Sequence, residues 1–107
     1  MNEKILHLLG IARRAGRLTL GNDAVIESLR RGNAKLVLLA KDLSPRTAGG
    51  VRLAAEEEGI ALQALSSTMD EISMALGKRT GVVAVNDAGF ASRLIALCTA
   101  QAAGTEE

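Results

Sequence analysis

Residues 16–45 read GRLTLGNDAVIESLRRGNAKLVLLAKDLSP, and the order of turns and apolar runs in this stretch decides the fold. Leu18, Thr19 and Leu20 predict a short extended segment before Gly21. Asn22 or Asp23 then offers a side-chain cap for a helix, which Gly32 closes. The stretch therefore begins with an extended segment followed by an amphipathic helix.

A strand and a second helix start follow without a gap. The run KLVLLA at residues 35–40 is short, apolar and bounded by polar residues, which predicts a strand buried on both faces. Ser44 followed by Pro45 predicts a helix start, with serine as the cap and proline at the first helical position. We expect this helix to run to Gly59.

The alternation of helices and strands continues outward on both sides. Upstream, Ile5, Leu8, Leu9 and Ala12 have helical spacing. Downstream, the pattern predicts strands at 60–65 and 82–85, a helix opened by the capping box Thr68-x-x-Glu71, and a final helix capped by Asn86-Asp87. This order predicts an α/β protein, a three-layer α/β/α sandwich with about four strands. We expect one domain over residues 1–100 and a frayed tail at 101–107.

Composition narrows the class of protein. The chain has 107 residues, of which 48% are hydrophobic and 23% charged, values typical of one globular domain. Apolar runs are far shorter than a membrane span, no apolar signal core follows the N-terminus, and Cys98 has no second cysteine to pair with. We therefore expect a cytoplasmic protein with no membrane partner. Phe90 is the sole aromatic residue, which excludes a base-stacking platform.

The formal net charge of +1 conceals a division along the chain. Residues 1–52 hold ten basic and four acidic residues, a balance of +6, whereas residues 53–107 hold three basic and eight acidic residues, a balance of −5. A basic half favours contact with an anion. Two arginine pairs also lie where cations stabilise the last turn of a helix: Arg13 with Arg14, and Arg30 with Arg31.

No catalytic or metal-binding pattern is present. His7 and Cys98 are single and far apart, so they form neither a metal cluster nor a Cys–His dyad. On the apolar face of its helix, Cys98 is expected to be a small buried hydrophobe. The loop from Gly77 to Gly81 contains Gly-Lys but lacks the first glycine and the Ser or Thr of a phosphate-binding P-loop. We expect no enzyme, no cofactor and no small-molecule substrate.

Three stretches carry a resemblance to a known family: LGIARRAGRL at 9–18, AKLVLLAKD at 34–42 and ALGKRTGVVAVNDAGFA at 75–91. In their order and spacing the chain resembles the kink-turn-binding ribosomal protein family, the seven-Ae and thirty-e proteins of the large subunit, and within it the small bacterial YlxQ-type proteins. The resemblance covers residues 5 to about 97. It implies a mixed four-stranded sheet, structured RNA such as rRNA or kink-turn RNA as partner, and the ribosome or translation-associated proteins as further partners.

The RNA site of that family includes the start of the second helix, where the pattern is G-x-N-E-x-x-K. Free N–H groups at a helix N-terminus bind phosphates, and nearby polar side chains read exposed base edges. The resemblance assigns this role to Gly21, Asn22 and Asp23. Gly21 matches the glycine, and Asn22 lies one position before the expected asparagine. The departures are Asp23 for that asparagine, Ala24 for the glutamate and Glu27 for the lysine. In the alternative interpretation, Asn22 and Asp23 are a plain helix cap.

The second contact region of the family is the loop before the last strand, here the loop with Lys78 and Arg79. We expect it to line one rim of the sandwich with basic residues of the first half: Arg17, Lys35, Lys41 and Arg46. Alternatively these are ordinary solvated charges. Two functions follow. One is a non-enzymatic RNA-binding protein that uses the helix N-terminus and a basic rim. The other is a protein-interaction module that kept the fold and lost kink-turn recognition.

Overall fold

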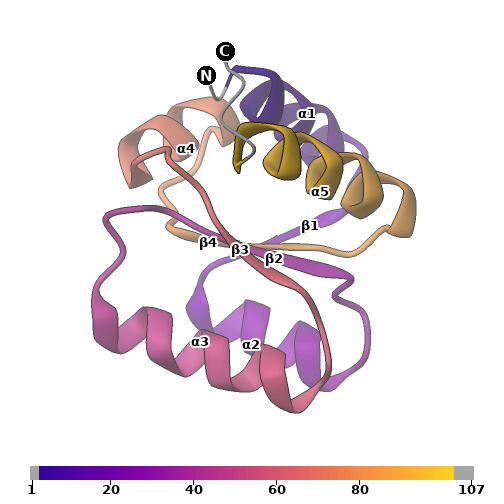
Figure 1. Cartoon of the computed structure of the whole chain (residues 1–107), viewed down its shortest axis with the longest axis vertical. Helices are drawn as coiled ribbons and strands as arrows, with labels where there is room; N and C mark the ends of the chain where they lie inside the picture. Colours follow the sequence, from indigo (N-terminus) through magenta and orange to yellow (C-terminus); the bar gives the residue numbers. More distant parts are fainter. Residues whose placement is uncertain (1–2, 103–107) are drawn as a thin grey trace.

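The computed structural model describes residues 3–102, which form three layers (Figure 1). Helices and strands alternate along the chain in the order α1 (Glu3–Arg14), β1 (Leu18–Leu20), α2 (Asn22–Arg30), β2 (Leu36–Leu39), α3 (Pro45–Glu57), β3 (Leu62–Ala64), α4 (Met69–Leu76), β4 (Val82–Val85) and α5 (Ala88–Ala102). In Figure 1, α1, α4 and α5 cover one face of the sheet, and α2 and α3 cover the other. The predicted α/β/α sandwich is confirmed.

The four strands lie in the order β1-β4-β2-β3. Strand β4 is antiparallel to both β1 and β2, whereas β2 and β3 are parallel, so the sheet is mixed. This arrangement brings the C-terminal ends of β1, β2 and β3 to the same end of the sheet as the N-terminal end of β4. We call it the Gly21 end, because the Gly21 N–H donates to the Val82 carbonyl there (3.0 Å). The opposite end is the Lys35 end, where the Lys35 N–H donates to the Val85 carbonyl (2.7 Å).

The core consists of two apolar clusters separated by the sheet. Leu36 and Leu38 of β2 pack into the cluster under α1, α4 and α5, whereas Val37 and Leu39 pack into the cluster over α2 and α3. All four residues of β2 are buried, as are all four of β4. A central strand covered on both faces needs apolar residues at every position, which explains the unbroken apolar runs.

Several helix starts follow the predictions. The Ser44 hydroxyl accepts a hydrogen bond from the Thr47 N–H (3.3 Å), with Pro45 as the first helical residue. Thr68 and Glu71 form the reciprocal capping box of α4. Asp87 caps α5 by accepting from the Phe90 N–H (2.9 Å).

One predicted cap is wrong, and a second is made by only one of its two predicted residues. Helix α2 begins at Asn22, its N-cap is Gly21, and no side chain caps it. The reason is tertiary: the hydrogen bond from Gly21 to Val82 fixes the end of β1, and the backbone of Gly21 (φ 98°) turns directly into the helix. Of the predicted pair Asn86-Asp87, Asp87 caps α5, whereas the Asn86 side chain bonds to Thr19 and Ser28.

The observed helix ends lie at or near the predicted ones. Arg13 and Arg14 occupy the last turn of α1, as predicted, and Arg30 the last turn of α2. Helix α3 ends at Glu57, two residues before the predicted limit. Helix α5 includes the first two residues of the predicted tail, and residues 103–107 lie outside the described part. None of the described helices combines the length and apolar character that a membrane crossing requires.

Candidate nucleic-acid interface

Three segments that are distant in sequence meet at the Gly21 end: the β1–α2 junction, the β2–α3 loop (residues 40–44) and the α4–β4 loop (residues 77–81). The Gly21 N–H bonds to the Val82 carbonyl (3.0 Å), and the Ala40 N–H bonds to the Gly81 carbonyl (2.9 Å). The two backbone bonds attach the first two segments to the start of β4, where the third segment ends. Figure 1 shows the resulting cluster of loops at one end of the sheet.

The N-terminus of α2 is open to an incoming anion. The first bond of the helix runs from the Val25 N–H to the Gly21 carbonyl (2.9 Å), so the N–H groups of Asn22, Asp23 and Ala24 precede the helical ladder. No side chain caps them, and all three residues are exposed. Asn22 instead donates to the Asp23 carboxylate (3.4 Å). Unpaired N–H groups and the positive helix end together form the element that binds phosphates in many proteins.

The β2–α3 loop and the first turn of α3 place two exposed cations at the same end of the sheet as this helix start. Lys41 is the second residue after β2, and Arg46 lies in the first turn of α3. Among the described residues Lys41 forms no ion pair with the neighbouring Asp42, whose carboxylate accepts the Met69 N–H (2.8 Å) at the start of α4. A cation in the first helical turn is disfavoured by the helix dipole, so helix stability does not explain Arg46. A negatively charged ligand would explain it.

The α4–β4 loop is held rigidly by the helix it follows. Gly77 ends α4 in the left-handed conformation (φ 75°). The Thr80 N–H then donates to the Ser73 hydroxyl (3.0 Å), and the buried Thr80 hydroxyl donates to the Val82 carbonyl (2.8 Å). A Cβ at Gly81 would lie 2.9 Å from Leu43 Cδ1, so the loop packs closely against the β2–α3 loop. The position of the loop is therefore fixed by contacts that do not involve its two basic residues.

The exposed cations of this end differ in how far they are neutralised. The ion pairs between described residues are Arg31 with Glu27 (2.8 Å) and Arg79 with Asp70 (3.1 Å). Among the described residues, no carboxylate pairs with the other three cations of this end, Lys41, Arg46 and Lys78. Lys78 and Arg79 also line an open concavity of about 490 Å³ along α4, whose wall includes the exposed side chain of Met74.

The predicted single basic rim is wrong for two of its members. Lys41 and Arg46 lie at the Gly21 end, together with the loop of Lys78 and Arg79. Arg17 lies at the Lys35 end, where its carbonyl accepts the Asn86 N–H (2.8 Å), and Lys35 defines that end. The reason is chain direction: Arg17 and Lys35 precede β1 and β2, whereas Lys41 follows β2. Residues before and after a strand lie at opposite ends of the sheet.

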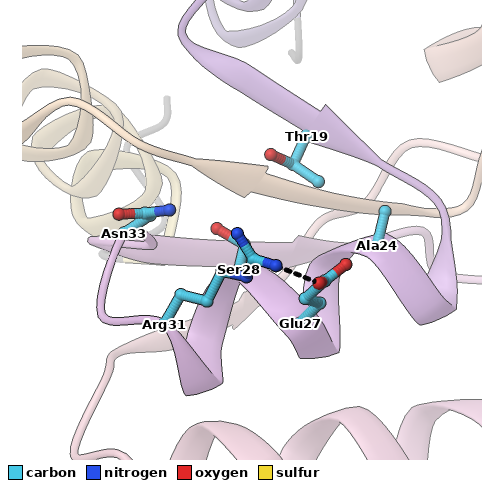
Figure 2. Close-up of a pocket in the computed structure, with 6 residues that line it drawn as sticks. All are labelled: Thr19, Ala24, Glu27, Ser28, Arg31 and Asn33. Atoms are coloured by element: carbon cyan, nitrogen blue, oxygen red, sulfur yellow. Dashed lines mark ion pairs between the residues drawn. The ribbon is translucent and has the colours of Figure 1, made fainter.

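A polar concavity that the sequence did not predict lies between α2 and the edge strand β1 (Figure 2). It encloses about 270 Å³ and is lined by Thr19, Ala24, Glu27, Ser28, Arg31 and Asn33. Ser28 donates to the Asn86 side-chain oxygen (2.9 Å), and the Asn86 amide donates to the Thr19 hydroxyl (2.8 Å). One feature of the sequence indicated this site. Ser28 lies three residues after Val25 and therefore on the core-facing side of the helix. A hydroxyl that is buried there requires a hydrogen-bond partner.

The described residues contain no group of three or more His, Cys, Asp or Glu side chains that is arranged to hold a metal ion. His7 is exposed on α1, and Cys98 is buried, as predicted. The polar groups of the Gly21 end include, besides the carboxylates of Asp23, Asp42 and Asp70, N–H donors and basic side chains, which are ligands for anions.

Comparison with solved structures shows the same class of fold. A protein of unknown function from Bacillus halodurans C superposes with a TM-score of 0.84 at 30% identity, covering 88% of this chain and 95% of that one. A 15.5kD RNA binding protein of Giardia lamblia superposes with a TM-score of 0.79 at 18% identity, covering 92% and 88% of the two chains. The chain is thus a small α/β/α domain of a type seen in bacteria and eukaryotes.

Sequence comparison identifies the family. The profile of the ribosomal protein L7Ae/L30e/S12e/Gadd45 family matches residues 3–95. The RNA-binding protein YlxQ of Bacillus subtilis (strain 168) is 40% identical over 91 residues, which are 84% of this chain and 90% of that protein. The large ribosomal subunit protein eL8 of Haloquadratum walsbyi is 38% identical over 89 residues, 80% and 73% of the two chains. The chain belongs to the L7Ae/L30e/S12e/Gadd45 family, as its resemblance predicted.

Proposed function

We propose that this protein is a non-enzymatic RNA-binding protein that contacts structured RNA in the cytoplasm through the Gly21 end of its sheet. The observation that carries the proposal is the open N-terminus of α2 beside Lys41 and Arg46, two exposed cations without a carboxylate partner among the described residues. Relatives that are named as RNA-binding or as large-subunit ribosomal proteins support it.

The proposed mechanism is phosphate recognition by backbone and charge. The N–H groups of Asn22 and Asp23, at the positive end of α2, bind phosphate oxygens. Lys41 and Arg46 neutralise neighbouring phosphates, and Lys78 and Arg79 contact the RNA from the α4–β4 loop. Because each neutralised phosphate releases counterions, the affinity falls steeply with salt.

The partner that we propose is structured RNA, such as rRNA or kink-turn RNA, bound with weak sequence preference. Asp23 lacks the amide donors of an asparagine, and the Ala24 methyl group makes no hydrogen bond to a base edge. Glu27 is negative where the family pattern has a lysine. The phosphate contacts at the helix start do not depend on these three side chains. We also propose that the protein associates with the ribosome or with translation proteins, because its relatives include large ribosomal subunit proteins.

The test is fluorescence anisotropy with a labelled kink-turn hairpin, a fragment of rRNA and a plain duplex of matched length, each at several salt concentrations. We expect binding of the structured RNAs, with a strongly negative slope of log affinity against log salt. The absence of binding to every RNA at low salt would overturn the proposal.

A second candidate is a protein-interaction module, and Met74 is the observation that favours it. This residue is 85% exposed, and it lines the concavity along α4. Affinity capture from lysate with and without nuclease separates the two functions. A protein partner survives nuclease treatment, whereas a partner bridged by RNA is lost. Met74→Ser should weaken only a nuclease-resistant partner.

A further inference from the structure

We propose that the outward side of helix α3 binds the same side of a second copy of this chain, so that the protein forms a weak two-fold dimer with antiparallel α3 helices. We call this surface the α3 face. Its residues recur every three or four positions, which places them along one side of the helix, and all are exposed: Arg46, Gly49, Gly50, Leu53, Glu56 and Glu57. The proposal does not depend on RNA binding.

The α3 face carries a protruding side chain next to a hollow. Leu53 is 57% exposed. One turn earlier, Gly49 and Gly50 present bare helix backbone, and a Cβ at either position would meet no atom within 4 Å. Glycine inside a helix is destabilising relative to alanine, so two in succession indicate a packing reason, which the chain itself does not supply. A leucine from a second helix fits between them, because the missing side chains allow a close approach.

The charges at the two ends of the α3 face lie against the helix dipole. Arg46 lies in the first turn, at the positive end, whereas Glu56 and Glu57 lie in the last turn, at the negative end. Both placements are unfavourable within a single helix. Within residues 3–102, none of these three side chains forms an ion pair. An antiparallel second helix would neutralise all of them, since it brings the acidic end of each copy to the basic end of the other.

The apolar and the charged features specify the same register. Leu53 lies three to four residues after the glycine pair, and the middle of this interval is at the level of Val51. Arg46 lies ten to eleven residues before the two glutamates, and the middle of that interval is also at the level of Val51.

A two-fold axis at this level has two effects at once. It places Leu53 of each copy between the glycines of the other, and it places Arg46 of each copy beside the glutamates of the other. A surface that is complementary to itself in this way is what a two-fold interface requires. The match in both features favours a second copy over an unrelated protein. In Figure 1, α3 lies on the side of the sheet away from α1, α4 and α5, with its outward side uncovered by the other elements.

The experiment measures mass by sedimentation equilibrium on nuclease-treated, full-length protein. The face of one helix is small for an interface, so we expect a Kd between about 10 µM and about 1 mM, which weakens as salt screens the charges. The average mass should rise with concentration from that of a monomer toward that of a dimer. A chain that is still monomeric at about 1 mM overturns the proposal.

Two variants test the packing of Leu53 against the glycines. Leu53→Ser should weaken dimerisation about tenfold or more. The matched control is Ile95→Ser on α5, at the other side of the sheet, where Ile95 is 40% exposed; it should leave the dimer unchanged.

The second packing variant, Gly49→Gln/Gly50→Gln, fills the hollow with good helix formers. It should raise the melting temperature of dilute protein and yet abolish dimerisation, so the loss could not come from unfolding. A dimer that survives either packing change as well as it survives Ile95→Ser overturns the α3 face as its interface.

A charge exchange tests the antiparallel register. Arg46→Glu and Glu56→Lys/Glu57→Lys should each weaken dimerisation about tenfold, because like charges then meet at both ends of the interface. In an equimolar mixture of the two variants, opposite charges meet again at both ends, and affinity should recover to within about threefold of wild type. A mixture that associates no better than its components overturns the proposal.

The outcomes of this test are separate from those of the proposed function. Arg46 also belongs to the proposed RNA interface, so every sample is free of RNA. A chain that binds RNA but does not dimerise leaves the proposed function standing. A chain that dimerises as described but binds no RNA fails only the proposed function.

Discussion

The side-chain amide of Asn86 donates a hydrogen bond to the Thr19 hydroxyl at 2.8 Å, across 67 residues of sequence. The same side chain accepts the Ser28 hydroxyl at 2.9 Å. One asparagine at the end of β4 thus ties the edge strand β1 to helix α2. It holds the two elements that flank the concavity between α2 and β1, and its removal should affect both the stability of the protein and the shape of that concavity.

Replacing Asn86 by alanine should lower the free energy of unfolding by about 1–3 kcal/mol, because the buried Ser28 hydroxyl loses its partner. Urea denaturation followed by circular dichroism measures the change. Asn33→Ala is the matched control, since Asn33 is exposed and its loss should cost within about 0.5 kcal/mol. Equal stability of the two variants would contradict a structural role for the network.

Replacing glycine by alanine should change the free energy of unfolding in opposite directions at Gly21 and Gly49. At Gly21 (φ 98°) it should destabilise the protein by about 1–3 kcal/mol, because a side chain strains that backbone conformation. Gly49 lies inside α3 with open space around its Cβ position, so Gly49→Ala should stabilise by about 0.5–1 kcal/mol. Thermal melting of both variants checks the prediction. A destabilising Gly49→Ala, or a neutral Gly21→Ala, would disagree with these backbone conformations.

Cys98 gives the stability a component that depends on pH. Burial raises the pKa of its thiol above the ordinary value of 9.0. Below the pKa of the unfolded thiol both states are protonated, and the thiol adds no pH dependence. Above it the unfolded chain ionises first, so the free energy of unfolding falls as pH rises through the folded pKa.

Cys98→Ala isolates this component. The small cavity it leaves should cost about 1 kcal/mol near neutral pH. The stability difference between wild type and variant should then narrow between roughly pH 8 and pH 10. Urea titrations at each pH measure the difference, and the other titrating groups, common to both chains, cancel. A constant difference over this range would show that the thiol titrates alike in both states.

The sequence predicted the central sheet well because β2 and β4 are apolar at every position, a pattern that burial on both faces requires. Local hydrogen bonds made Ser44 and Thr68 predictable as caps. The start of α2 was not predictable, because it depends on the hydrogen bond between Gly21 and Val82, which are far apart in sequence.

The candidate site was predicted in part for a related reason. The Gly21 end could be recognised from a short family pattern, since Gly21, Asn22 and Asp23 are adjacent in sequence. Arg17 and Lys35 can be assigned to an end of the sheet only when two things are known. One is whether each residue precedes or follows its strand, and the other is the order and direction of the strands. The concavity between α2 and β1 depends on Asn86, which bonds to Ser28 across 58 residues of sequence, so no local pattern predicts it.

The α4–β4 loop offers the sharpest test of charge in the proposed interface. Reversing both cations, Lys78→Glu/Arg79→Glu, should weaken binding of the kink-turn hairpin by tenfold or more and flatten its salt dependence. The fold should tolerate the change, because Ser73, Thr80 and Gly81 hold the loop. Unchanged affinity in the anisotropy assay would remove this loop from the interface.

Single variants should separate the two cations of the loop. Arg79 shares its charge with Asp70 (3.1 Å), whereas Lys78 has no carboxylate partner among the described residues. Lys78→Ala should therefore cost more affinity than Arg79→Ala. Asp70→Asn, which frees Arg79, should strengthen binding about two- to fivefold at low salt and less at high salt, because salt screens exposed charges. An Asp70→Asn variant that binds no more tightly than wild type would show that Arg79 does not face the RNA.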